Sequence, residues 1–215
     1  MTARDRDLME RTVSPDFRSA SDGNPSGGEG GRPPSRGGAT IWFTGLPSAG
    51  KSTIAHALAD RLVAAGHRVQ VLDGDEVRPY LSAGLGYSRE DRDRNVQRIG
   101  WVARLLARHG VVVLVPVIAP YAAAREAVRA DHHAAGVPFA EVYVSTSLEV
   151  AESRDVKGLY AEARRGELSG LTGVDDPYER PEHAELVLDT ARVDLATAVE
   201  RSAHLLAAIT EEPAR

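Results

Sequence analysis

The stretch that decides the fold is residues 45–53, which read Gly-Leu-Pro-Ser-Ala-Gly-Lys-Ser-Thr. It matches the pattern G-x-x-x-x-G-K-[ST] of phosphate-binding loops. The glycines let the backbone curl so that successive N–H groups point at phosphate oxygens, and the start of the following helix adds a partial positive charge. A chance glycine turn is the alternative, but a strand pattern before the loop and a helix pattern after it supply the context that the motif requires. We therefore expect nucleotide contacts from Gly45, Ser48, Ala49, Gly50, Lys51, Ser52 and Thr53.

The lysine and the first hydroxyl residue that follow the second glycine have distinct expected roles. Lys51 can reach the β- and γ-phosphates of a nucleoside triphosphate, so we expect it to be catalytic. The Ser52 hydroxyl can ligate Mg²⁺. The loop thus implies ATP together with Mg²⁺, and it says nothing about the group that accepts a phosphate.

Outward from this loop, apolar runs of strand length alternate with helical patterns. We expect strands at 41–44, 69–72, 111–118, 139–145 and 185–188, and helices at 51–65, 91–109, 122–135, 148–154 and from Leu195, with Asp194 as the N-cap of the last one. Such alternation predicts an α/β fold with a central parallel sheet covered by helices on both faces. Ligands bind outside the carboxyl ends of the strands in such sheets. Residues 156–184 show little periodicity.

Bulk properties restrict the class of protein. The length of 215 residues suits one α/β domain, at 39–213, after a tail at 1–38 whose Gly-, Ser-, Pro- and Arg-rich composition predicts disorder. A net charge of −5 argues against a protein that coats nucleic acid. The lack of cysteine excludes disulfides and thiol chemistry. No apolar run approaches the ~18 residues of a membrane span, and the charged start is unlike a secretory signal, so we expect a cytoplasmic enzyme.

The carboxylate that such a reaction needs has one best candidate by position. Asp73 and Asp75 follow the second expected strand, whereas the third ends in Pro-Val-Ile-Ala without an acid. Asp73 can ligate Mg²⁺ and can orient and deprotonate a substrate hydroxyl. The alternative is a structural turn in which either aspartate caps a helix.

Residues 84–100 form a charged block beside this turn. Helical spacing puts Asp91, Asn95 and Arg98 on one side of a helix. The forked guanidinium groups of Arg78 and Arg92 can bind an anionic acceptor, and an aromatic ring at position 87 can stack on a base. A solvated, salt-bridged helix has the same appearance, so this block alone leaves both interpretations open.

Five motifs in order resemble the adenylylsulfate kinase family, over residues from about 39 to 190. They are the phosphate loop with its Gly-Leu opening, Leu-Asp-Gly-Asp-x-x-Arg from Leu72, the block from Gly84 to Gly100, Arg-Asp-Val-Lys-Gly-Leu-Tyr from Arg154, and the run from Gly170 to Glu179. The resemblance implies a P-loop kinase-type three-layer fold with a C-terminal lid segment. It also implies transfer from MgATP to the ribose 3′-hydroxyl of adenosine 5′-phosphosulfate. Residues that would hold this acceptor are Asp73, Arg78, Tyr87, Arg92, Asn95, Ile118, Lys157 and Leu171, the last two in a lid spanning about 156–180.

Departures from the family pattern narrow the mechanism. Ala119 stands where many members have serine, so a phosphoserine intermediate at this position is impossible and we expect direct in-line transfer. The pair His132-His133 invites a metal site, but adjacent helical residues point about 100° apart, and we expect a solvated surface instead. Two other functions stay open: a divergent paralogue with another acceptor, and a nucleotide-binding subunit without catalysis. The resemblance further suggests a homodimer and leaves room for a separate sulfurylase partner.

Overall fold

The structure of this chain is a computed structural model that describes residues 37–211. The expected tail, apart from Gly37 and Gly38, lies outside the described residues, as do the last four residues of the chain. Five parallel strands form one sheet in the order β2-β3-β1-β4-β5. The strands are β1 (Ala39–Thr44), β2 (Val69–Val71), β3 (Val112–Pro116), β4 (Phe139–Val144) and β5 (Leu186–Leu188).

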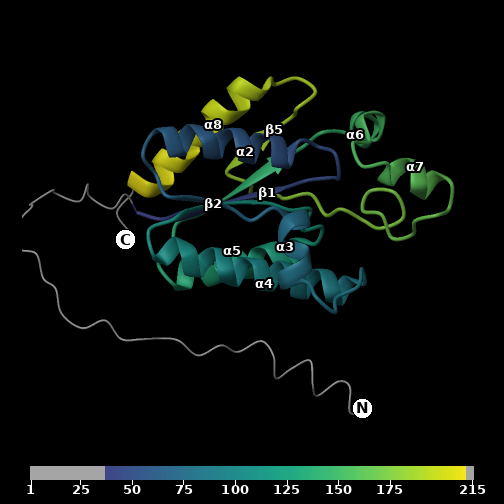
Figure 1. Ribbon diagram of the computed structural model, residues 1–215, viewed down its shortest axis with the longest axis horizontal. Coiled ribbons are helices and arrows are strands. Elements are labelled where there is room, and N and C mark those ends of the chain that lie inside the picture. The colour runs from purple at the N-terminus through teal and green to yellow at the C-terminus, as the bar shows by residue number, and fades with distance from the viewer. Residues whose placement is uncertain (1–36, 212–215) are drawn as a thin grey trace, which may run out of the picture. The chain divides into compact units, whose positions relative to one another are not determined.

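Helices cover both faces of this sheet, which confirms the predicted three-layer α/β fold. Figure 1 shows α2 (Lys51–Ala64) and α8 (Leu195–Glu211) on one face, and α3 (Gly74–Leu81), α4 (Arg89–Arg108) and α5 (Ala122–Ala134) on the other. The short helices α6 (Leu148–Arg154) and α7 (Leu159–Arg164) lie beyond the carboxyl end of β4.

Burial on both faces explains why the strands read as continuous apolar runs. Along β1, Ile41 and Phe43 belong to the core beneath α2 and α8, whereas Trp42 belongs to the core beneath α4 and α5. All six residues of β1 are buried, and so are all five of β3. The central strands therefore fix the position of the loops that leave their carboxyl ends.

Helix α3 is an element that the sequence reasoning missed. It follows β2 directly, with Asp73 as its N-cap and Pro79 inside it, and none of its residues is buried. Only Val77 and Leu81 are partly buried against the core, and one such pair is too short a periodic pattern to predict a helix. The helix expected from 91 begins two residues earlier, because the Ser88 side chain caps it by accepting from the N–H of Asp91 (3.2 Å).

The end of β3 also differs from the prediction. The apolar run continues to Ile118, but the strand ends at Pro116. The chain turns sharply just afterwards, because Ala119 has a φ of 43°. That turn places the residues after β3 across the carboxyl ends of the sheet.

The expectation of a solvated surface at His132-His133 is wrong for the first histidine. His132 is 0% exposed, and its two ring nitrogens lie 2.8 Å from the Val128 carbonyl oxygen and 3.0 Å from Thr40 Oγ1. Burial lowers the pKa of this imidazole. His133 is exposed, as expected. Among the described residues, no three His, Cys, Asp or Glu side chains gather into a metal-binding group.

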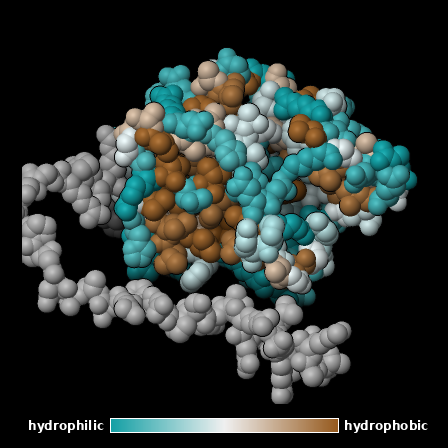
Figure 2. Space-filling model, in the orientation of Figure 1, coloured by the Kyte–Doolittle hydropathy of each residue, from teal (hydrophilic) through white to brown (hydrophobic). Residues whose placement is uncertain are grey.

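The sheet has an open edge at β2. Figure 2 shows apolar residues gathered between the two helical layers, where Figure 1 labels β2. A hollow of about 500 Å³ lies there, lined by β2 and by α3 residues such as Val77 and Tyr80. Within residues 37–211, no helix combines the length and the apolar character needed to cross a bilayer.

Candidate active site

The phosphate-binding loop connects the end of β1 to the start of α2. Gly45 has a φ of 150° and Gly50 a φ of 103°. A Cβ atom on Gly45 would lie 2.5 Å from the Val144 carbonyl oxygen, so a larger residue does not fit. Gly50 is the N-cap of α2 and offers no side chain to the helix N–H groups. These N–H groups and the helix dipole are thus available to an anion.

Lys51 is buried at the start of α2 and folds back over the loop. Its Nζ donates to the carbonyl oxygens of Gly45 (3.0 Å) and Leu46 (2.7 Å). Burial, together with the positive charge of Lys157, lowers the pKa of Lys51 to about 7, and the negative charge of Asp73 partly offsets this. A phosphate group bound at the loop would favour the protonated ammonium.

Asp73 lies at the carboxyl end of β2 and is buried. Its Oδ1 accepts from the N–H of Asp75 (3.0 Å), so it does cap a helix. The capping and catalytic interpretations are compatible, because the same carboxylate is close enough to influence the charge on Lys51. Asp75 does not cap the helix with its side chain and pairs with Lys157 instead. The structure thus gathers Lys51, Asp73, Asp75 and Lys157 at the carboxyl ends of β1 and β2.

Four residues expected to hold the acceptor, which we call the acceptor clamp, lie near one another: Arg78, Tyr87, Arg92 and Asn95. The Arg78 guanidinium lies over the Tyr87 ring, 4.2 Å from its centroid, and Arg92 lies 5.9 Å from the same centroid. The ring is 61% exposed. Asn95 accepts from the Ser82 hydroxyl, and Arg98 donates to the Leu81 carbonyl oxygen (2.9 Å). The predicted helix face with Asp91, Asn95 and Arg98 therefore contacts the segment 81–86.

Arg92 connects this clamp to the predicted lid. Its guanidinium donates to Thr172 Oγ1 (2.7 Å), to the Gly170 carbonyl oxygen (2.5 Å) and to the Tyr87 carbonyl oxygen (2.8 Å), and it lies 3.1 Å from the Asp176 carboxylate. All three nitrogens are engaged, so a direct bond to an anionic acceptor would replace or share one of these contacts.

The predicted lid has a small core of its own. Tyr160 and Leu171 are buried there with Ala151, and Leu46 of the phosphate loop packs against them. The Tyr160 hydroxyl donates to the Pro47 carbonyl oxygen (3.0 Å). The lid is therefore fastened to the phosphate loop, and the Leu171 side chain lies in this core.

Comparison with known proteins bears on what this arrangement does. The family model described as adenylylsulphate kinase matches residues 37–189. The chain belongs to the adenylylsulfate kinase family. It is 52% identical over 164 residues to an adenylyl-sulfate kinase of Picosynechococcus, with 76% of this chain and 90% of that protein covered.

Solved structures of kinases from this family have the same fold. The APS kinase of Mycobacterium tuberculosis in complex with AMPPNP and APS is 44% identical and has a TM-score of 0.77, over 79% of this chain and 98% of that one. A hexameric APS kinase from Thiobacillus denitrificans is 38% identical with a TM-score of 0.61, over 81% of this chain and 29% of that one. These two matches make the likeness specific to the family rather than to α/β kinases in general.

The sequence did not predict a group of side chains that binds the phosphate loop through the carbonyl oxygen of Ala49. The Ala49 carbonyl oxygen accepts from Thr146 Oγ1 (3.1 Å) and Thr190 Oγ1 (2.9 Å). Arg154 donates to Thr190 Oγ1 (2.7 Å) and to the Thr190 carbonyl oxygen (3.0 Å). Arg154 opens one of the recognised motifs, but nothing in the sequence pairs it with a threonine 36 residues later.

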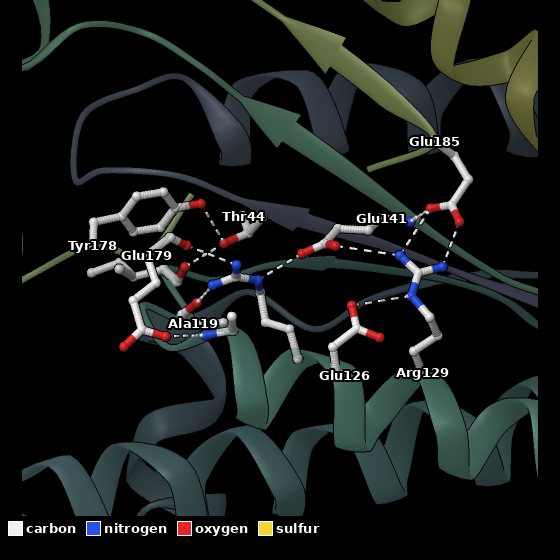
Figure 3. Close-up of polar contacts among 11 residues, drawn as sticks. Thr44, Ala119, Glu126, Arg129, Glu141, Tyr178, Glu179 and Glu185 are labelled. Carbon is white, nitrogen blue, oxygen red and sulfur yellow. Dashed lines mark hydrogen bonds and ion pairs between the residues drawn. The ribbon is translucent and has the colours of Figure 1, made fainter. Parts of the chain in front are cut away.

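A second missed group surrounds Ile118 and Ala119. Figure 3 shows Thr44, Ala119, Tyr178 and Glu179 at one end of a row of charged side chains that continues through Glu141 to Arg129 and Glu185. Thr44 Oγ1 donates to the Ile118 carbonyl oxygen (2.6 Å). Ile118 is half-buried at the carboxyl end of β3, the side of the sheet where the acceptor is expected.

Proposed function

We propose that this chain transfers the γ-phosphoryl group of MgATP to the ribose 3′-hydroxyl of adenosine 5′-phosphosulfate. The products are 3′-phosphoadenosine 5′-phosphosulfate and ADP. The observation that carries the proposal is the grouping of Lys51, Asp73 and Lys157 beside the phosphate loop, in a chain of this family. The bound APS in the Mycobacterium tuberculosis relative supports the choice of acceptor.

The residues present fit a magnesium ion. Mg²⁺ prefers oxygen ligands and is held by one or two protein groups together with substrate phosphates and water. Ser52 at the start of α2 and Asp73 at the end of β2 offer a hydroxyl and a carboxylate of this kind. When bound, the ion would neutralise part of the negative charge of the phosphates. A site of this type does not need three acidic side chains.

Two residues of the chain would have distinct roles in the transfer. Lys51 contacts the β- and γ-phosphates, while Asp73 orients the 3′-hydroxyl and takes its proton. The 3′-oxygen forms a bond to the γ-phosphorus as the bond from that phosphorus to the bridging β,γ-oxygen breaks, and ADP leaves. Ala119 has no hydroxyl that could carry the phosphoryl group, which supports direct in-line transfer.

The acceptor would be held by Arg78, Tyr87, Arg92, Asn95, Ile118, Lys157 and Leu171. One face of the Tyr87 ring is already covered by Arg78, so a stacked adenine would use the other face or replace the guanidinium. Residues 156–180 would act as a lid, which keeps out water that competes as phosphoryl acceptor. The Lys157–Asp75 pair and the three contacts of Arg92 with Gly170, Thr172 and Asp176 would couple the lid to the acceptor side.

The expected assembly, location and partner of this chain are further proposals. Self-association as a homodimer is supported by the oligomeric relative and by Trp101 and Leu105, which are exposed one turn apart on α4. Size-exclusion chromatography with light scattering measures it. A cytoplasmic location follows from the need for ATP. A separate sulfurylase partner stays a prediction, because such an enzyme must supply the acceptor.

One assay tests the proposed reaction. The protein is incubated with MgATP and adenosine 5′-phosphosulfate, and the 3′-phosphorylated product is measured. We expect Lys51→Ala to remove most of the activity, and Asp73→Asn to lower kcat more than it weakens ATP binding. Asp60→Asn, an exposed acid on α2, is the matched control and should leave kcat unchanged. ATP binding by the wild type without turnover would contradict the proposal, and full activity of Asp73→Asn would refute that residue's role.

A further inference from the structure

The turn between β3 and α5 (residues 117–121) is buried and strained. Ala119 is buried with a φ of 43°, a left-handed conformation that is unfavourable for a residue with a Cβ atom. Such conformations persist only where the surrounding structure holds them, and they concentrate at functional sites. Ile118, which we place against the acceptor, is the residue immediately before it.

One buried guanidinium holds this turn. Arg125 Nη1, from the first turn of α5, donates to the Ala119 carbonyl oxygen (2.7 Å), and the Arg125 side chain is only 2% exposed. Thr44, the last residue of β1, holds the preceding carbonyl oxygen, that of Ile118. The turn is therefore tied both to α5 and to the residue that precedes the phosphate loop.

The same guanidinium reaches the far end of the predicted lid. Arg125 Nη2 donates to the Glu179 carbonyl oxygen (2.8 Å). Glu179 in turn donates its N–H to the Pro120 carbonyl oxygen (2.8 Å) and accepts from the N–H of Ala122 through Oε2 (2.8 Å). The neighbouring Tyr178 hydroxyl lies 2.9 Å from Thr44 Oγ1 (Figure 3). The lid end therefore bonds directly to residues 120 and 122 of this region. It reaches residues 118 and 119 through Thr44 and Arg125.

A buried carboxylate fixes the guanidinium itself. Arg125 Nε lies 2.7 Å from Glu141 Oε1, an ion pair whose angles fall outside those of a hydrogen bond. The Glu141 side chain is 3% exposed, and burial raises its pKa, although both nearby arginines oppose this. Since removing one member of a buried pair leaves an uncompensated charge, Glu141 strongly favours a cation at this place. Only the arginine fork can also serve two carbonyl oxygens on separate segments.

We propose that Arg125 is a positioning residue for phosphoryl transfer. It holds the acceptor-side turn, residues 117–121, and the C-terminal end of the lid, residues 178–179, as one unit. The position of Ile118 and the closure of the lid therefore depend on the same side chain. This inference rests on the proposed function, because it concerns how the acceptor is held.

Arg125→Lys tests the proposal, because it keeps the charge beside Glu141 and removes the fork. Arg129→Lys is the matched control: Arg129 lies one turn further along α5 and also pairs with Glu141, but its other partners are Glu126 and Glu185. We expect both variants to lower Tm. Only Arg125→Lys should raise KM for adenosine 5′-phosphosulfate, by about tenfold for two lost charge-assisted bonds, with KM for ATP nearly unchanged.

A second measurement does not depend on activity. Arg125→Lys should also speed hydrogen exchange at the N–H groups of Ala122 and Glu179, and Arg129→Lys should not. If the two variants lower Tm alike, leave KM for the acceptor unchanged and do not alter this exchange, Arg125 serves stability alone and the proposal is overturned.

A third variant covers the case in which Arg125→Lys does not fold. Glu179→Ala removes the bond to the Ala122 N–H from a side chain that is 38% exposed, so the protein should fold. It should raise KM for the acceptor by about threefold and speed exchange at Ala122. An unchanged KM and unchanged exchange would overturn the proposal. A wild type without turnover would instead contradict the proposed function, and the exchange measurement would then decide on Arg125.

Discussion

The lowered pKa of Lys51 makes ATP binding a proton-linked event. Burial and the charge of Lys157 lower the pKa of Lys51 from 10.5 to about 7, so at pH 8 only roughly a tenth of the free protein carries a charged ammonium there. A bound triphosphate places several negative charges beside Nζ and raises its pKa well above 8. Binding of MgATP should therefore take up about 0.9 proton at pH 8 and about 0.1 at pH 6.

The affinity should follow the same linkage. Above pH 7, each further unit of pH should weaken MgATP binding by up to about tenfold, because the ligand must then bind the minority protonated form. Below pH 7 the affinity should be nearly constant. The sign follows from a pKa that is lower in the free protein than in the complex.

Isothermal titration calorimetry in buffers of different ionisation enthalpy measures this uptake. The slope of the observed enthalpy against the buffer enthalpy gives the number of protons. Lys51→Arg is the matched control, because a guanidinium stays charged across this range and any remaining uptake then belongs to other groups. Lys157→Met should reduce the uptake, since it removes a charge that lowers the pKa of Lys51. A wild-type uptake near zero at pH 8 would refute the reasoning.

Three further predictions concern other parts of the chain. Arg92→Lys should raise KM for adenosine 5′-phosphosulfate by about tenfold and make residues 156–180 more sensitive to proteolysis, because a lysine cannot keep the bonds to Gly170 and Thr172. Equal rates of proteolysis in the variant and the wild type would contradict this prediction. Thr190→Val should lower ATP affinity, measured by calorimetry, by about threefold to tenfold, because it removes a donor to the Ala49 carbonyl oxygen in the phosphate loop. Thr197→Val on α8 is the control, and equal effects of the two substitutions would count against the role of Thr190. His132 has a lowered pKa, so the unfolded chain binds a proton there more readily, and the free energy of unfolding should fall as the pH drops below about 6.5. Chemical denaturation at several pH values should show that His132→Gln weakens this acid sensitivity and that His133→Gln does not. Equal dependence of stability on pH in all three proteins would contradict the assignment.

The sheet and the phosphate loop could be predicted because their signals are local. A strand buried on both faces reads as an apolar run. β3 does so over its whole length, and β1 does so at residues 41–43 between two buried threonines. The loop requires glycine where φ is positive, as at Gly50, and its lysine follows at once. Both features can therefore be recognised in the sequence without knowledge of tertiary contacts.

The missed features depend on contacts between distant segments. Helix α3 has no fully buried residue and packs only Val77 and Leu81 against the core, so its main local signal is the Asp73 cap. Arg125 and Glu141 resemble solvated charges in the sequence, yet they are buried against each other. Glu179, which accepts from Arg125, lies 54 residues later in the chain, and no periodicity connects the two. His132 is hidden for the same reason, since its partner Thr40 lies 92 residues earlier.

The acceptor clamp could be predicted in part, because a shared helix face follows from local spacing and its contacts do not. Spacing predicts that Asn95 and Arg98 share a helix face, but it does not predict the contact of this face with residues 81–86. The engagement of Arg92 with Gly170 and Thr172 does not follow from spacing, because it depends on where the lid folds.

Product formation by the wild type and by Asp73→Asn is the decisive test of phosphoryl transfer to adenosine 5′-phosphosulfate. Each protein is mixed with MgATP and adenosine 5′-phosphosulfate, and 3′-phosphoadenosine 5′-phosphosulfate and ADP are quantified over time. We expect equal amounts of the two products from the wild type. In Asp73→Asn we expect a kcat at least about a hundredfold lower, with ATP affinity largely kept. ADP formed without the phosphorylated nucleotide, or no turnover despite ATP binding, would contradict transfer to this acceptor.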